Sequence, residues 1–415
     1  MLIQSTIWAI AAVAAMGVVV RPFGTPEAIW AVLGAAILVA TGLLSSSDAL
    51  VGIGKGTDVY LFLFGMMLLA ETARAEGLFD WAAAHATRRA NGSAGRMFTL
   101  VYVVGTIVTI FLSNDATAVV LTPAVAAAAR TAKAEQPLPY LLICAFIANA
   151  ASFVLPISNP ANLVLYGSQM PPLLEWLPRY LPASVVSIMV TYVILRWTQR
   201  KALHRPIATD IAVPRLSHSG KVAAAGIATT AAALIVSSAL DIQLGLPTAI
   251  AGILTTLIVL VVERKGPWDT IKDISWSVLP LVAGLFVLVE ALDKTGLIRL
   301  LGEAIHRAAE QSVSQASWAV GLAVAFGSNL INNLPAGLIA SSALQTSAVP
   351  DQLTRAALIG VDLGPNLSVT GSLATILWLA ALRREGLRIG AAAFLKIGFL
   401  VMPPALLLSL AVALL

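Results

Sequence analysis

The chain is dominated by long apolar stretches that carry no charged residue. The first twenty residues contain no Lys, Arg, Asp or Glu. A helix needs about 20 mostly apolar residues to cross a bilayer, and many of the later charge-free runs approach or exceed that length. These runs recur at 28–47, 97–114, 116–129, 136–174, 222–240, 274–289, 311–350 and 363–382. The pattern predicts a chain that crosses a membrane many times.

The composition excludes an ordinary soluble enzyme. Hydrophobic residues make up 58% of the chain and charged residues only 11%, whereas about a quarter of a soluble chain is charged. A membrane β-barrel would show short segments of alternating polarity, and these are missing from the sequence. We therefore expect an all-α polytopic membrane protein with about ten spans.

The ionisable residues limit the partners. The net charge of +5 fits basic cytoplasmic loops better than nucleic-acid binding, because no soluble stretch combines basic and aromatic residues. Cys144 is the only cysteine, and the four His are scattered, so neither a disulfide within the chain nor a zinc site is expected. We expect no metal, no cofactor and no nucleic acid. Cys144 is expected to be a small core residue.

The two halves of the chain resemble each other. At a constant spacing of 219 residues, Glu71 pairs with Glu290 and Asn114 pairs with Asn333. An internal duplication of this kind is typical of transporters. We predict an N-terminal repeat at 1–198, a basic cytoplasmic loop at 199–221 and a C-terminal repeat at 222–415.

The basic residues predict the orientation. When the loop at 199–221 is placed in the cytoplasm, most Lys and Arg fall on the same side, as the positive-inside rule requires. Both termini are then outside, and the two repeats are inverted, with the matched Arg88 and Arg307 on opposite sides. The basic residues left outside are Lys55, Arg179, Lys294, Arg299, Arg307 and Arg355.

Four polar, mostly Pro-rich patches interrupt the apolar sequence, two in each repeat. They predict re-entrant hairpin tips near 113–117 and 332–336, and broken spans near 158–162 and 364–372. Irregular backbone at membrane depth must be buried in protein or line a wet cavity, so the breaks are expected to meet at a central site. The expected binding residues are Ser113, Asn114, Thr117, Ser158, Asn159, Asn332, Asn333, Thr370 and Ser372.

The chain resembles the arsenite efflux permease (ArsB) family, within a superfamily of ion transporters. The resemblance covers nearly the whole chain and is strongest at 78–83, 111–115 with 121–123, 362–365 and 371–378. It implies an inverted-repeat fold with two re-entrant hairpins in the inner (plasma) membrane of a prokaryotic cell. It also implies efflux of trivalent arsenite and antimonite, and it allows a separate soluble arsenical-pump ATPase as a partner.

The site chemistry suits a neutral cargo. Dicarboxylate carriers of the superfamily show Ser-Asn-Thr tips, whereas this chain has Asp115 and Leu334 in the third place. Arsenite in neutral water is the uncharged trihydroxide As(OH)3, which needs amide and hydroxyl partners and no fixed charge. We expect secondary-active export of this cargo in exchange for protons, by alternating access.

Two carboxylates are expected to carry the proton. Asp115 lies at a hairpin tip, and Asp362 precedes the Gly-Pro break, where ionisable groups inside a membrane are functional candidates. The alternative for Asp115 is to cap the helix that follows it, which does not exclude the functional role. Glu71 and Glu290 are expected to form structural ion pairs, and Lys396 could either pair or extend to the interface.

Three other functions compete with this hypothesis. A sodium- or proton-coupled transporter of an organic or inorganic anion would use the same fold. A membrane transferase would need clustered Asp for magnesium, which the sequence does not contain, so an enzyme is not expected. A passive channel is also compatible with the sequence.

Overall fold

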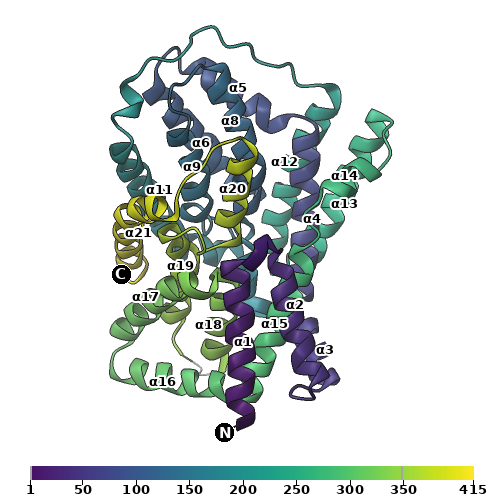
Figure 1. The fold of residues 1–415 in the computed structure, drawn as a ribbon, viewed down its shortest axis with the longest axis vertical. Coiled ribbons are helices and arrows are strands. Elements are labelled where there is room, and N and C mark those ends of the chain that lie inside the picture. The colour runs from purple at the N-terminus through teal and green to yellow at the C-terminus, as the bar shows by residue number, and fades with distance from the viewer. Residues whose placement is uncertain (1, 347–348) are drawn as a thin grey trace.

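The protein is all-helical in the computed structural model, which describes residues 2–346 and 349–415 (Figure 1). Within these residues no β-strand forms, apart from an isolated bridge between Ser93 and Pro206. Among the described helices, six are long and apolar enough to cross a membrane, or seven if the bent pair α3 (Ser46–Lys55) and α4 (Thr57–Ala75) is one span. The prediction of an all-α polytopic protein is confirmed, whereas the number of spans stays a prediction.

The N-terminal half contains long helices separated by short, irregular segments. Apolar stretches form helices in lipid because every backbone polar group must there be paired within the segment. Besides α3 and α4, the elements are α1 (Leu2–Val20), η1 (Pro22–Gly24), α2 (Glu27–Ala40), α5 (Leu78–Arg89), α6 (Ala94–Leu112), α7 (Asn114–Ala116), η2 (Thr117–Leu121), α8 (Thr122–Thr131), α9 (Leu138–Ala150), η3 (Pro156–Ser158), α10 (Pro160–Tyr166), η4 (Gly167–Gln169) and α11 (Leu173–Thr198).

The C-terminal half follows the same order of elements. A linker that includes the short η5 (Ala202–His204) connects it to the first half. The elements are α12 (His218–Ala239), α13 (Gly245–Glu263), α14 (Trp268–Asp273), α15 (Val278–Lys294), α16 (Leu297–Gln311), α17 (Val313–Ile331), α18 (Asn333–Thr346), α19 (Asp351–Leu363), η6 (Gly364–Leu367), α20 (Leu373–Arg384) and α21 (Ala391–Ala413).

The helix ends repeat at the spacing found in the sequence. α6 and α17 begin after Ser93 and Ser312, whose hydroxyls accept hydrogen bonds from backbone N–H groups three residues further on. Both helices end at a residue with positive φ, which is Ser113 (98°) in the first half and Asn332 (74°) in the second. The duplication therefore extends to the backbone conformation.

The two repeats have opposite orientations. In Figure 1, α5 and the linker before α12 lie at the top of the molecule, whereas α16, the counterpart of α5, lies at the bottom. The matched residues Arg88 and Arg307 thus belong to helices at opposite ends. The inverted arrangement is confirmed, while the division at 198 and 222 stays a prediction.

The repeats pack against each other through small residues. α4 lies against α13 and α15 lies against α2, so each contact joins the two repeats. A Cβ on Gly65 would lie 2.2 Å from the Thr248 carbonyl oxygen, and a Cβ on Gly284, the matched residue, would lie 2.7 Å from the Ala31 carbonyl carbon. Glycine allows this backbone contact, which is the usual way to pack helices in a membrane.

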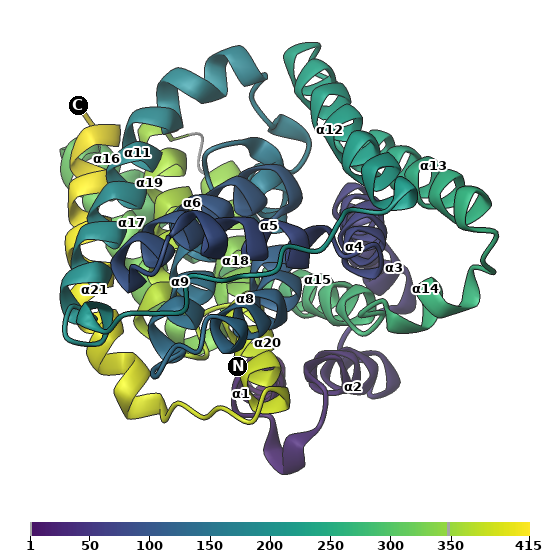
Figure 2. The same cartoon turned by 90° about the horizontal axis from the view of Figure 1, so that it is seen from above.

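The helices separate into two sides when seen from above. Figure 2 shows α12, α13 and α14 on one side and α11, α17 and α21 on the other. α9 and α18 lie between them in both views. α18 and α20, which follow two of the helix breaks, lie in the central part of this view (Figure 2).

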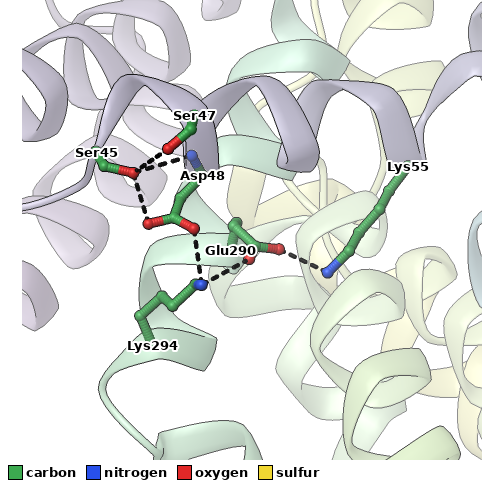
Figure 3. Close-up of polar contacts among 6 residues, drawn as sticks. All are labelled: Ser45, Ser47, Asp48, Lys55, Glu290 and Lys294. Carbon is green, nitrogen blue, oxygen red and sulfur yellow. Dashed lines mark hydrogen bonds and ion pairs between the residues drawn. The ribbon is translucent and has the colours of Figure 1, made fainter.

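Ion pairs lie at both ends of the molecule, at the matched Glu71 and Glu290. At the bottom, the carboxylate of buried Glu290 accepts a hydrogen bond of 2.6 Å from Lys55 on α3, and Lys294 pairs with Asp48 (Figure 3). At the top, Arg74 donates to Glu71, and it also contacts Asp273 of α14 at 2.8 Å. Both clusters join the two repeats. Glu71 and Glu290 therefore each form the structural ion pairs that the sequence predicts.

Candidate functional site

The four helix breaks meet around one small cavity. Each break contributes side chains to its wall, and α4 and α15 contribute one apolar residue each. The cavity has a volume of about 10 Å³, which holds roughly one water molecule. Its lining consists of Leu63, Asn114, Asp115, Asn159, Pro160, Val278, Asn333, Leu334, Ser372, Leu373 and Ala374.

The structure brings together five of the residues expected at the site. Asn114 and Asp115 come from the first hairpin tip, Asn333 from the second, and Asn159 and Ser372 from the two broken spans. Asp115 is the second residue of α7, and Ser113 occupies the N-cap position before that helix, so Asp115 is not its cap.

The hairpin-tip amides present unused acceptors. The side-chain oxygens of Asn114 and Asn333 are buried and have no hydrogen-bond partner among the described residues. A buried polar atom without a partner is costly, so each oxygen is suited to accept a hydrogen bond from a bound O–H group. These two residues occupy matched positions of the repeats, and both line the cavity.

Helix N-termini surround the cavity. Asn159 and Ser372 are the caps of α10 and α20, and their side-chain oxygens accept from the N–H groups of Ala161 and Thr375 at 3.0 and 3.1 Å. The N–H of Asn333 at the start of α18 donates to the Gly371 carbonyl at 2.9 Å, which holds the hairpin tip against the second broken span. The cavity therefore lies in the positive field of these helix ends.

Other expected residues support the breaks and do not line the cavity. Ser158 donates to the Ile110 carbonyl at 3.0 Å, and Thr117 lies 2.8 Å from the Thr109 hydroxyl. Thr370 donates to the Asn329 carbonyl at 3.2 Å, and the Asn332 side chain accepts from the Leu334 N–H. Ser113 lines a neighbouring larger cavity and not the small one.

Asp362 lies behind the cavity wall. It is fully buried, and its Oδ1 accepts a hydrogen bond of 2.7 Å from the Asn159 amide, while its Oδ2 has no partner within the described residues. Asp362 therefore contacts the site through Asn159. Lys396 is exposed on α21, and Cys144 is buried in α9 as a core residue.

Sequence reasoning missed Asn149. It is fully buried at the end of α9, where its amide donates to Asn366 at 3.0 Å and to Thr375 at 3.4 Å, and its oxygen accepts from Ser372 at 3.3 Å. It lies in a continuous apolar run, where a single Asn is inconspicuous. The sequence signal that identifies it is its position: Asn149 and Asp362 are matched residues of the two repeats, 213 residues apart, as are Asn159 and Ser372.

A larger cavity adjoins the small one and is lined in part by residues of α4, α5 and α8. It measures about 660 Å³ and shares Leu63, Asp115, Pro160 and Val278 with the small cavity. Its outer wall carries charges of both signs. The ionisable residues in its lining are Glu71, Arg74, Asp80, Asp115, Lys272, Asp273 and Arg384. Asp115 is thus the ionisable residue that both cavities share.

An inverted duplication whose helix breaks surround a polar cavity defines the class of membrane transporters. Residues 8–361 match the model of the family described as citrate transporter (CitMHS). The chain belongs to this family, and its resemblance to arsenical permeases is confirmed by the relatives below.

Curated relatives match along nearly the whole chain. The arsenical pump membrane protein of Escherichia coli K12 is 27% identical in an alignment of 402 positions that covers 92% of this chain and 91% of that protein. The putative arsenical pump membrane protein of Bacillus subtilis is 26% identical in an alignment of 421 positions, gaps included, that covers 94% of each chain. Among solved structures, the YdaH transporter of Alcanivorax borkumensis shares the fold, with a TM-score of 0.59 at 14% identity over 88% of this chain and 86% of that one.

Proposed function

We propose that this protein exports trivalent arsenite and antimonite from the cytoplasm in exchange for protons, by alternating access. The observation that carries the proposal is the lining of the small cavity, which among the described residues has amide and hydroxyl groups, one carboxylate and no Lys, Arg or His. As(OH)3 offers three O–H donors to the free oxygens of Asn114 and Asn333. A polycarboxylate would need cationic partners in the pocket.

The relatives support the same cargo. Several transporters named arsenical pump membrane proteins align with more than nine-tenths of this chain. The description of the family model names citrate, which keeps a sodium- or proton-coupled anion transporter as the second candidate. The larger cavity gives that candidate little support, because its basic residues are balanced by Glu71, Asp80 and Asp273.

Asp115 is the principal proton carrier in this proposal, and Asp362 is the second candidate. A neutral cargo cannot respond to the membrane potential, whereas moving one charge through 100 mV is worth about 2.3 kcal/mol. Asp115 reaches both the small cavity and the larger one, so a proton on it can exchange with solvent. Asp362 is enclosed, and its contact with the site runs through Asn159.

The orientation belongs to the proposal. With the linker at 199–221 in the cytoplasm and both termini outside, the cavity of about 660 Å³ faces the cytoplasm of a prokaryotic cell. Arsenite then enters this cavity from the cytoplasm, which is the side from which it is exported. A soluble arsenical-pump ATPase is a proposed partner at the same face.

The test is transport into everted membrane vesicles, with arsenite measured by mass spectrometry. The proposal expects accumulation that depends on the proton gradient and stops when a protonophore is added. Sodium-dependent uptake of citrate by the purified protein in proteoliposomes, without arsenite transport, would favour the second candidate and overturn the proposal.

A further inference from the structure

Asn149 and Asp362 hold the caps of the two half-helices that border the site. α9 and α19 begin and end at matched residues, so Asn149 and Asp362 occupy the same position of the two repeats. The caps Asn159 and Ser372 are related by the same spacing. Each pair therefore has a counterpart in the other repeat.

The two contacts cross between the repeats. Asp362, in the second repeat, accepts a hydrogen bond from Asn159 in the first. Asn149, in the first repeat, accepts one from Ser372 in the second. Because Asn159 and Ser372 both line the small cavity, the position of each half-helix end depends on a side chain of the opposite repeat.

The two side chains differ in how completely they are paired. The Asn149 amide uses both its donor and its acceptor, through Asn366, Thr375 and Ser372. Asp362 leaves Oδ2 without a partner among the described residues. The hydrogen-bonding groups of Asn149 at the contact between α9 and α20 are thus paired. At the contact between α10 and α19, one carboxylate oxygen of Asp362 has no partner among the described residues.

We propose that Asn149 is a positioning residue of the site, which fixes Ser372 and the start of α20 through hydrogen bonds that cross between the repeats. The proposal rests on the proposed function only in taking the small cavity as the binding site. Asn149 keeps the α20 side of the cavity rigid in this arrangement.

A single-cysteine reporter tests the position of α20 without any cargo. Cys144 is the only cysteine, so Cys144→Ala gives a cysteine-free chain, and Leu373→Cys then places one thiol at the start of α20 in the cavity wall. The reaction rate of this thiol with a small methanethiosulfonate reagent reports how often the α20 end is exposed. The measurement uses the full chain in membranes.

Asn149→Ala should raise the labelling rate at least about fivefold, since losing the buried hydrogen bond that holds Ser372 alone shifts a local equilibrium by about that factor. Ile147→Val, which trims a buried side chain of the same helix without removing a hydrogen bond, should leave the rate unchanged. Asn149→Asp keeps the acceptor for Ser372 and should give a labelling rate between those of the parent and of Asn149→Ala. It therefore provides the test if Asn149→Ala does not fold. In arsenite transport, Asn149→Ala should raise KM more than it lowers kcat.

Equal labelling rates for Asn149→Ala and its parent, or the same increase with Ile147→Val, would overturn the positioning role. If the protein without any substitution transports no arsenite, the proposed cargo is wrong, but the labelling result still decides the role of Asn149.

Discussion

Ser113 and Asn332 adopt the same unusual backbone conformation at matched positions of the two repeats. Their φ and ψ are 98° and 161° for Ser113, and 74° and 154° for Asn332, in a region that is populated almost only by glycine. Each residue directly precedes an Asn that lines the cavity. The strain is therefore located where the hairpin chain turns into the site.

Ser113→Gly is expected to stabilise the protein by about 1 kcal/mol, because glycine adopts this conformation without strain. Arsenite transport is expected to fall, since the turn becomes less fixed. Thermal unfolding in detergent measures the stability. Ser113→Ala, which removes the hydroxyl but keeps the strain, should not be stabilised, and a gain of the same size in this control would contradict the explanation.

Alanine at Asn114 or Asn333 is expected to abolish arsenite resistance of the host cell. Each change removes one of the free amide oxygens in the cavity, and losing a hydrogen bond to the cargo lowers affinity by about tenfold or ~1.4 kcal/mol. The protein should remain in the membrane at its normal level, as checked by immunoblot. Gln311→Ala, at the exposed end of α16 and outside the site, is the control. Full resistance from both site variants would refute a binding role.

Asp115→Asn is expected to separate binding from coupling. The amide resembles the protonated carboxyl group, so arsenite binding should persist while transport loses its dependence on the pH gradient. Counterflow of arsenite in proteoliposomes should continue. A variant that still concentrates arsenite against its gradient would show that Asp115 is not the carrier, and the same measurement on Asp362→Asn would then test the second candidate.

Lys55→Met is expected to destabilise the protein by about 1 kcal/mol, because it leaves the buried carboxylate of Glu290 with only the more distant Lys294. Arg205→Met, which removes a pair whose side chains are both more than half exposed, should cost less than about 0.5 kcal/mol. Chemical or thermal unfolding compares the two. If the two variants lost the same amount of stability, burial of Glu290 would add nothing to the strength of its ion pair with Lys55.

Gly65→Ala is expected to destabilise the contact between α4 and α13 by several kcal/mol, because the new methyl group would overlap the Thr248 carbonyl. Gly54→Ala, also in a helix but with open space around it, should be neutral or slightly stabilising. Membrane yield and unfolding temperature are the measurements. A Gly65→Ala protein as stable as the parent would mean that the helices can separate without cost.

The helix breaks and the duplication could be predicted from sequence because both leave a mark in residue type. Pro and polar residues at 158–162 and 364–372 interrupt apolar runs, and Asn114 and Asn333 recur at the spacing of Glu71 and Glu290. The meeting of the four breaks follows from the cost of unpaired backbone in lipid.

The function of each polar side chain within a break could not be predicted in the same way. Asn333 lines the cavity, whereas its neighbour Asn332 bonds the backbone of Leu334, and nothing in residue type separates the two. The direction of a side chain depends on φ and ψ at the turn, which the sequence does not state. Asn149 was missed because its partners Ser372 and Asn366 lie in the other half of the chain.

The small size of the central cavity also affects how tightly this protein can appear to bind. A volume of about 10 Å³ admits a water molecule but not As(OH)3, so binding of the proposed cargo there requires the empty protein first to expand around the hairpin tips. Only the expanded fraction of molecules can bind, and the apparent dissociation constant is therefore larger than the intrinsic one by the reciprocal of that fraction. A substitution that widens the empty site would tighten measured binding without adding a single contact, and it would slow release on the far side.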